Sequence, residues 1–133
     1  MKYMLDTNIC IYIMEHRDSK TLEKLFALNH DNTCTSTIVY GELAFGAEKS
    51  NRKVYSSFAQ ELFLNSITVL PVTPAVAKEY GAIRAKLEKN GTPIGPNDLW
   101  IAAHAKSLGL TLITNNEKEF KRIKGLKVEN WAH

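Results

Sequence analysis

The chain is poor in cysteine and has no long hydrophobic run. Its two cysteines, Cys10 and Cys34, match no metal-ligand spacing and are too few for a disulfide framework, so we expect small buried hydrophobes in a reducing compartment. No segment approaches the roughly 18 apolar residues of a membrane span. Asp6 interrupts the N-terminal apolar stretch before it reaches the length of a signal-peptide core. These absences predict a cytoplasmic protein with no membrane association.

Zinc ligation and disorder are also disfavoured. The four histidines (His16, His30, His104 and His133) have no zinc-ligand spacing with cysteine or with each other. The hydrophobic share of 44% and the charged share of 23% are ordinary values for a globular protein, and we find no repeat, linker or low-complexity tract. The 133 residues therefore predict one domain, 1–133, with a mildly basic net charge of +3 that is compatible with a polyanionic partner.

Short β-favouring segments alternate with helical patterns along the chain. Strands are predicted at 2–5, 33–36, 67–72, 110–114 and 127–129, and helices at 9–15, 21–28, 38–49, 54–64, 75–89, 98–108 and 117–122. Phe58, Leu62 and Phe63 are expected to point inward from the helix over 54–64. The alternation predicts an α/β fold, a three-layer α/β/α sandwich with a mostly parallel central sheet.

Carboxylates follow several of these elements at their ends. Asp6 comes directly after the first strand, where open α/β sheets bind ligands, although it can equally cap the next helix. Thr7 and Asn8 are also able to cap that helix. Glu42 falls in the apolar stripe of its helix, where burial of an unpaired charge is costly, unless it lies at the edge of the stripe.

Two further acids have simpler alternative interpretations. Asp98 lies in the first turn of a nearly apolar helix, where an acid also suits the helix dipole. Glu119 follows the fourth strand and is equally consistent with an ordinary surface acid. Together with Asp6 and Glu42, these acids are expected at one edge of the sheet. Such a cluster repels itself unless a cation neutralises it, and oxygen-only ligands suit Mg²⁺ or Mn²⁺, which predicts phosphodiester chemistry.

Basic residues occur in groups that can contact a nucleic acid, although each group can be no more than a solvated face. The three groups are Lys49, Arg52 and Lys53; Arg84, Lys86 and Lys89; and Lys118, Lys121, Arg122, Lys124 and Lys127.

These segments resemble, in order and over essentially the whole chain, the PIN-domain ribonucleases, specifically the VapC-type toxins of VapBC toxin–antitoxin pairs. The matching segments are 4–8 (Met-Leu-Asp-Thr-Asn), 37–43 (Thr-Ile-Val-Tyr-Gly-Glu-Leu), 97–105, 112–116 with Glu119 and Phe120, and 128–131. Many PIN domains have a further Asp after the fourth strand, where this chain has Asn115 and Asn116. That departure leaves open whether Glu119 completes the acid cluster and whether a second metal binds.

The resemblance implies a Mg²⁺-dependent endoribonuclease toxin, with Mn²⁺ able to substitute, that cleaves RNA, including tRNA, and arrests translation. It implies Asp6 and Asp98 as metal ligands and Glu42 as a third acid that binds the metal or orients water. Thr7, Thr114 and Asn116 would support these acids by hydrogen bonds. A VapB-type antitoxin is expected to cover the acidic groove with a basic side chain among the carboxylates, and the toxin is expected to be a homodimer or part of a larger toxin–antitoxin assembly.

Two other functions fit parts of the sequence. An aspartate-nucleophile phosphatase also begins with a strand that ends in Asp, but it normally has a second acid two residues later, where this chain has Asn8. A non-catalytic RNA- or protein-binding α/β module would use the same acids only as helix caps.

Overall fold

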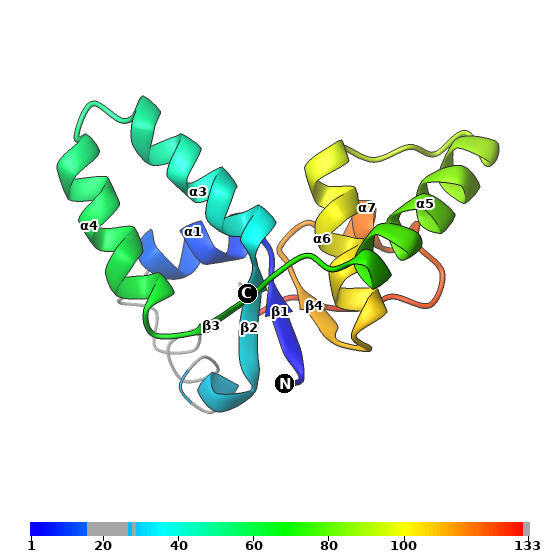
Figure 1. Ribbon diagram of the computed structural model, residues 1–133, viewed down its shortest axis with the longest axis horizontal. Coiled ribbons are helices and arrows are strands. Elements are labelled where there is room, and N and C mark those ends of the chain that lie inside the picture. The colour runs from blue at the N-terminus through cyan, green and yellow to red at the C-terminus, as the bar shows by residue number, and fades with distance from the viewer. Residues whose placement is uncertain (16–26, 28, 132–133) are drawn as a thin grey trace.

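The structure, a computed structural model, describes residues 1–15, 27 and 29–131. The helix predicted over 21–28 lies outside these residues, except for Ala27. Eleven helices and strands and one short 3-10 helix are described (Figure 1). They are β1 (Tyr3–Leu5), α1 (Thr7–Glu15), the 3-10 helix η1 (His30–Asn32), β2 (Thr33–Ser36), α3 (Thr37–Lys49), α4 (Lys53–Leu64), β3 (Thr68–Leu70), α5 (Pro74–Lys89), α6 (Pro96–Ser107), β4 (Thr111–Ile113), α7 (Glu117–Phe120) and β5 (Lys127–Glu129).

The five strands form one parallel sheet in the order β3-β2-β1-β4-β5. β1 is the central strand, and its three residues are buried, as the apolar sequence Tyr-Met-Leu requires of a parallel strand covered on both faces. β5 is an edge strand, as predicted. Helices flank the sheet, which confirms the three-layer α/β/α sandwich. Figure 1 shows α1, α3 and α4 on one side of the molecule and α5, α6 and α7 on the other.

The strand order places the switch point of the sheet between β1 and β4. The chain moves outward from β1 through β2 to β3 and then returns to the other side of β1 as β4. In open α/β sheets the crevice at the carboxyl ends of such strands is the usual ligand site. Asp6 ends β1 and Thr114 ends β4, so both face this crevice.

Side-chain contacts hold the helices in pairs. Tyr80 of α5 stacks on Trp100 of α6 with ring centroids 3.9 Å apart, and Nζ of Lys106 lies 2.7 Å from Oε1 of Glu79. In the other pair, Nε2 of Gln60 on α4 donates to the Leu43 carbonyl of α3 at 2.7 Å. The helical spacing of Val76, Ile83 and Leu87 gives α5 one buried face, with Tyr80 half-buried on it.

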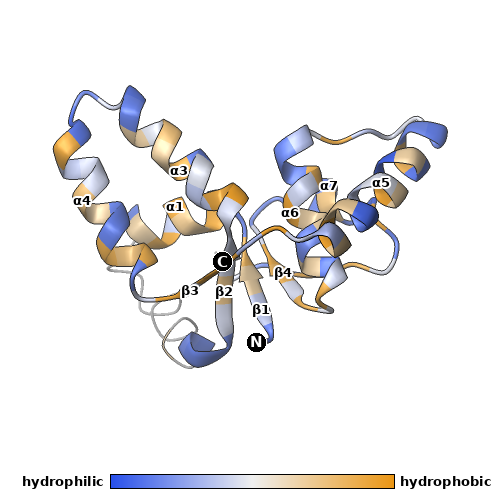
Figure 2. Ribbon diagram, in the orientation of Figure 1, coloured by the Kyte–Doolittle hydropathy of each residue, from blue (hydrophilic) through white to orange (hydrophobic). Residues whose placement is uncertain are grey.

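The predicted inward face of α4 is wrong in part. Phe63 is buried, but Phe58 is 61% exposed and Leu62 is 53% exposed. Figure 2 shows orange, hydrophobic segments along α3 and α4, the pair that extends away from the sheet. The apolar period of α4 is genuine, but most of this stripe meets neither the sheet nor another helix among the described residues.

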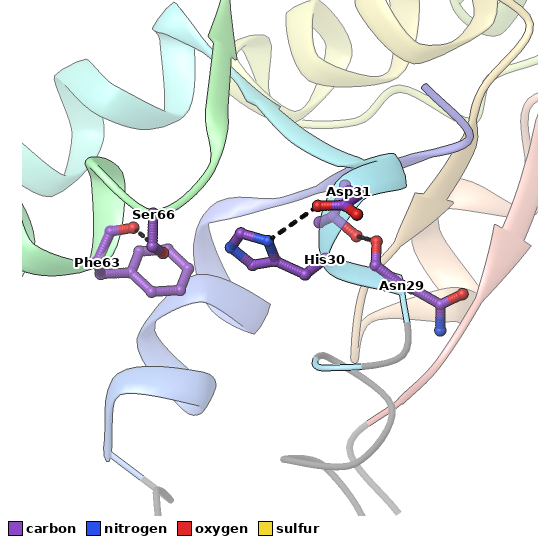
Figure 3. Close-up of polar contacts among 6 residues, drawn as sticks. Asn29, His30, Asp31, Phe63 and Ser66 are labelled. Carbon is purple, nitrogen blue, oxygen red and sulfur yellow. Dashed lines mark hydrogen bonds and ion pairs between the residues drawn. The ribbon is translucent and has the colours of Figure 1, made fainter.

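The opposite edge of the sheet, at the amino ends of the strands, carries ordinary turn contacts. Nδ1 of His30 lies 3.6 Å from Oδ1 of Asp31 just before β2, and the Ser66 hydroxyl donates to the Phe63 carbonyl at 2.6 Å just before β3 (Figure 3). His30 is therefore remote from the crevice. Cys10 and Cys34 are buried and unpaired, as predicted. Among the described residues, no helix has the length and hydropathy needed to cross a membrane.

Candidate active site

Asp6 takes the capping role that the sequence left as one of two alternatives, and it lies at the carboxyl end of the sheet. Its Oδ1 accepts a hydrogen bond from the backbone N–H of Ile9 at 2.8 Å, which makes Asp6 the N-cap of α1. The Thr114 hydroxyl also donates to this carboxylate, which is 2% exposed. The capping role expected of Thr7 and Asn8 is wrong, because both lie inside α1 and Asp6 caps the helix itself. One buried carboxylate therefore joins β1, α1 and β4.

Glu42 is held at the rim of the crevice by two donors. The Thr7 hydroxyl donates to Oε1, and Nδ2 of Asn97 donates to Oε2 at 3.3 Å. Of the two alternatives that the sequence left open, the structure supports a position at the edge of the stripe: Glu42 is half-buried, and Phe45 on the same stripe is 64% exposed. Glu42 therefore lies at the water boundary, held by two hydrogen bonds, and it forms no ion pair with a basic residue in the described part of the chain.

Asp98 and Glu119 contact each other. Asp98 lies in the first turn of α6, which begins with Pro96. Burial, the charge of Glu119 and a hydrogen bond between the two carboxyl groups contribute, in that order, to raising the pKa of Asp98 to about 7. The other bonds of Glu119 are from Nδ2 of Asn116 at 2.7 Å and from the backbone N–H of Gly95 at 3.4 Å.

The four carboxylates act on one another electrostatically. The pKa of Asp6 is raised to about 6, chiefly by burial. The bonds from Thr114 and Ile9 oppose the rise, and the charges of Glu42 and Glu119 add to it. Asp98 is raised in turn by the charges of Asp6 and Glu42. The structure thus brings together all of the predicted acids, including Glu119, whose place was open. Asn115 is exposed, whereas Asn116 supports Glu119 as expected.

The supporting hydrogen bonds were predicted in part. Thr7 and Thr114 bind the acids as expected, but the amide of Asn97 and the backbone N–H of Gly95 were missed as site groups. The signal for Asn97 was its place beside Asp98 at the start of a helix. Its partner could not be read from sequence, because Glu42 lies on a different helix. A cleft of about 500 Å³ adjoins Glu42, and its lining residues are Thr7, Thr37, Ile38, Gly41, Glu42, Phe45 and Asn97.

The carboxylate oxygens of the site suit a hard divalent cation, although the side chains are not arranged to coordinate one in this conformation. The four acids offer only oxygen atoms. Burial is the main cause of the raised pKa values of Asp6 and Asp98, and repulsion from neighbouring acids adds to it; a cation would relieve both effects. Within the described part of the chain, no three acids, histidines or cysteines are placed so that they could already hold a metal ion. Glu42 faces Thr7 and Asn97, and Asp98 bonds to Glu119, so binding would require these side chains to exchange partners.

The chain matches the PIN domain family over residues 3–126. It is 42% identical over 132 residues to the tRNA(fMet)-specific endonuclease VapC of Shigella flexneri, covering 99% of both chains. It is 45% identical to ribonuclease VapC2 of Haemophilus influenzae, again covering 99% of both. Among solved structures, the DNA-bound VapBC of Salmonella typhimurium contains a chain that aligns with a TM-score of 0.95 and 41% identity, covering 98% of both chains.

Proposed function

The chain belongs to the PIN-domain family of VapC ribonucleases, and we propose that it is an endoribonuclease toxin that works with Mg²⁺ or Mn²⁺ and is neutralised by a VapB-type antitoxin. The observation that carries the proposal is the convergence of Asp6, Glu42, Asp98 and Glu119 at the carboxyl end of the sheet. These acids come from four different elements, and burial and mutual repulsion raise the pKa of two of them. A fold that needed them only as helix caps would have no reason to gather them.

The roles of the residues follow from their contacts. Asp6 and Asp98, the two acids whose pKa values are raised, would be the direct metal ligands, and Glu119 would complete the cluster. A bound divalent cation would supply a Lewis acid for a phosphoryl oxygen and lower the pKa of a bound water. Glu42, fixed through both oxygens at the rim, is placed to orient water and to take its proton. Thr7, Thr114 and Asn116 hold three of the acids in these positions.

The substrate class is RNA, and tRNA is the form that we propose. The VapC of Shigella flexneri is named for tRNA(fMet), and the present chain is similar to it over its full length. Cleavage of such a molecule would arrest translation. The cytoplasm, where tRNA is found, is where we propose that the enzyme acts.

Replacement of single acids tests this function. Asp98→Asn removes a carboxylate at nearly constant shape, and we expect cleavage of tRNA in Mg²⁺ to fall at least about 100-fold. Asp31→Asn is the matched control, since Asp31 lies at the opposite edge of the sheet and is fully exposed. Growth arrest on induction should be lost in the first variant and kept in the second. Unchanged cleavage by both Asp98→Asn and Asp6→Asn would disprove the assignment.

The antitoxin is proposed to cover an apolar face on α1, α3 and α4. Seven large hydrophobic side chains are exposed there: Ile11, Tyr40, Phe45, Val54, Tyr55, Phe58 and Leu62. A cleft of about 690 Å³ lies between α1 and α4. Exposed apolar area on this scale is typical of an interaction site. Because Phe45 and Glu42 line the same cleft, a partner on this face can extend into the acid cluster and place a basic side chain there.

Homodimer formation and a larger toxin–antitoxin assembly are further parts of the proposal. Light scattering of the free toxin and of its complex measures both masses directly. A monomeric free toxin would remove the homodimer and leave the ribonuclease assignment intact.

A further inference from the structure

A second pocket, distinct from the acid cluster, brings together basic residues from separate parts of the sequence. Its volume is about 540 Å³, and it lies between α5, α6 and the turn that follows α7. Its basic side chains are Lys86, Lys106, Arg122 and Lys124, and Ala82, Ile83, Leu87 and Ile123 form apolar walls. Among the described residues, none of the side chains that line it is acidic. We refer to this site as the basic pocket.

The cations of the basic pocket are in different states. Lys106 forms an ion pair with Glu79. Its aliphatic chain packs against Gly125, where a Cβ atom in place of the glycine hydrogen would lie 3.2 Å from Cε of Lys106. Arg122 donates one N–H to the Pro93 carbonyl at 3.0 Å. The other N–H groups of its guanidinium are therefore available to a ligand. Lys86 and Lys124 are exposed and form no ion pair with any described residue.

The basic pocket and the acid cluster share one loop. Glu119 binds the backbone N–H of Gly95, and Arg122, three residues further along the chain, binds the carbonyl of Pro93. The loop from Pro93 to Gly95 therefore lies between the acid cluster, which suits a metal ion, and the basic pocket, which suits a phosphate. A polyanionic chain that crosses this loop would contact both sites.

We propose that the basic pocket binds backbone phosphates of the RNA substrate at a position away from the bond that is cleaved. The proposal rests on the function proposed above, because it needs a polyanion that also reaches the acid cluster. Arg122 can form paired hydrogen bonds to a phosphate, Lys86 and Lys124 act as point charges, and the apolar walls strengthen their field. In the sequence, each group of basic residues taken alone was also consistent with a solvated helix face. Their convergence in one concave site distinguishes them from Lys49 and Lys53 at the far end of α3 and α4.

Binding without cleavage tests the pocket separately from the catalytic function. The probe is fluorescently labelled tRNA(fMet), and affinity is measured in EDTA as a function of salt concentration. We expect Lys86→Gln combined with Lys124→Gln to weaken binding about tenfold at 100 mM salt and to lower the salt slope by about 1 to 2, since two phosphate contacts are lost. Lys49→Gln combined with Lys53→Gln, which removes the same charge elsewhere, should change binding less than about twofold.

Each other outcome has a defined meaning. If the Lys86/Lys124 variant kept the RNA affinity and the salt slope of the wild type, the proposal would be overturned. An equal loss of RNA affinity in the Lys49/Lys53 control would also overturn it, because that result would indicate only a general charge effect. If the Lys86/Lys124 variant lost affinity for the antitoxin and kept its affinity for RNA, the pocket would be a protein contact and the proposal would fail. Pocket-dependent RNA binding by a protein that cleaves no RNA would disprove the ribonuclease function and leave the pocket standing.

Discussion

Asp98 and Glu119 are joined by a hydrogen bond between their carboxyl groups, although they come from α6 and α7. The bond requires a proton, and burial together with the charge of Glu119 raises the pKa of Asp98 to about 7. A carboxyl pair that holds a proton near neutrality is ready to exchange it for a metal ion, because the cation supplies the same neutralisation.

Metal binding should therefore release a proton in a pH-dependent way. At pH 6 Asp98 is mostly protonated and Asp6 about half protonated in the metal-free protein, so Mg²⁺ binding should release about 1.4 protons; at pH 8.5 the release should be near zero. Titration calorimetry in two buffers of different ionisation enthalpy measures this number. Asp98→Asn should lower the release at pH 6 by close to one proton and leave only the roughly half a proton that Asp6 contributes, whereas Asp31→Asn should leave the release unchanged. Equal release at both pH values would contradict the assignment of the proton to Asp98.

Asp6→Asn should stabilise the metal-free protein at neutral pH. The pKa of Asp6 is raised to about 6 from 3.8, so the folded state binds more protons than the unfolded state between these values, and stability is lost as the pH rises through that window. An uncharged Asn avoids this loss and still caps α1. Its advantage over wild type should grow from near zero at pH 4 to on the order of 1–3 kcal/mol at pH 8, measured by urea unfolding in EDTA.

Asp6→Ala separates the cap from the charge. It also removes the charge but leaves the N–H of Ile9 without its acceptor, which should cost about 1 kcal/mol relative to Asp6→Asn at every pH. Equal stability of the two variants would mean that the bond to Ile9 contributes nothing.

Ser36 and His104 connect the elements that carry Glu42 and Asp98. Ser36 caps α3 by accepting from the N–H of Ile38 at 3.1 Å, and its hydroxyl lies 2.8 Å from Nδ1 of the buried His104 on α6. Burial lowers the pKa of His104, so the ring is neutral. Ser36→Ala should cost about 2 to 3 kcal/mol, from the lost cap and the unpaired ring nitrogen.

A double-mutant cycle isolates this contact. Ser36→Ala combined with His104→Phe should cost at least about 1 kcal/mol less than the sum of the two single changes. Ser66→Ala, which removes a hydroxyl from a turn at the other edge of the sheet (Figure 3), should be additive with His104→Phe. Additivity in both cycles would remove Ser36 as the partner of His104.

Thr7 should matter for cleavage and little for folding. Its hydroxyl donates to Glu42, and Thr7→Val removes that donor at nearly constant shape. We expect RNA cleavage to fall about 10- to 100-fold, the usual effect of releasing a group that positions a catalytic side chain. Thr7→Ser, which restores a hydroxyl, should recover most of the rate. A Thr7→Val variant that cleaves at the wild-type rate would show that Glu42 needs no such support.

Phe58→Ala should weaken antitoxin binding without harming the free toxin. The side chain is 61% exposed on α4, so its truncation removes little from the core, whereas an apolar anchor at an interface commonly contributes more than about 1 kcal/mol. We expect the dissociation constant for the cognate antitoxin to rise at least about tenfold and RNA cleavage by free toxin to stay unchanged. Leu108→Ala, at an exposed apolar site away from α1, α3 and α4, is the control. Equal antitoxin affinities for wild type and Phe58→Ala would argue that the partner binds elsewhere.

Much of the fold and the acid set could be predicted from local signals. The apolar segment 3–5 followed by Asp6 is a strand because three buried residues in a row suit a central parallel strand, and its carboxyl end is then a ligand position. Pro96 marked the start of α6 and so placed Asp98 in a first turn. Signals of this kind lie within a few neighbouring residues. Strand ends, helix starts and the acids at these positions could therefore be predicted from the sequence.

The rest depends on contacts between residues far apart in the chain, which only the tertiary structure decides. Periodicity shows that α4 has an apolar stripe, but whether Phe58 meets the core or a partner depends on what packs against it. In the same way, the sequence shows that Asp6 can cap a helix. That Glu119 lies near enough to act on the charge of Asp6 depends on where α7 folds relative to α6. The amino-acid sequence by itself determined which chemical groups are available and at which ends of the elements they lie. The packing of the helices and strands determined which of these groups come into contact. Burial and charge repulsion depend on neighbours from several segments, so no single segment of sequence reveals them.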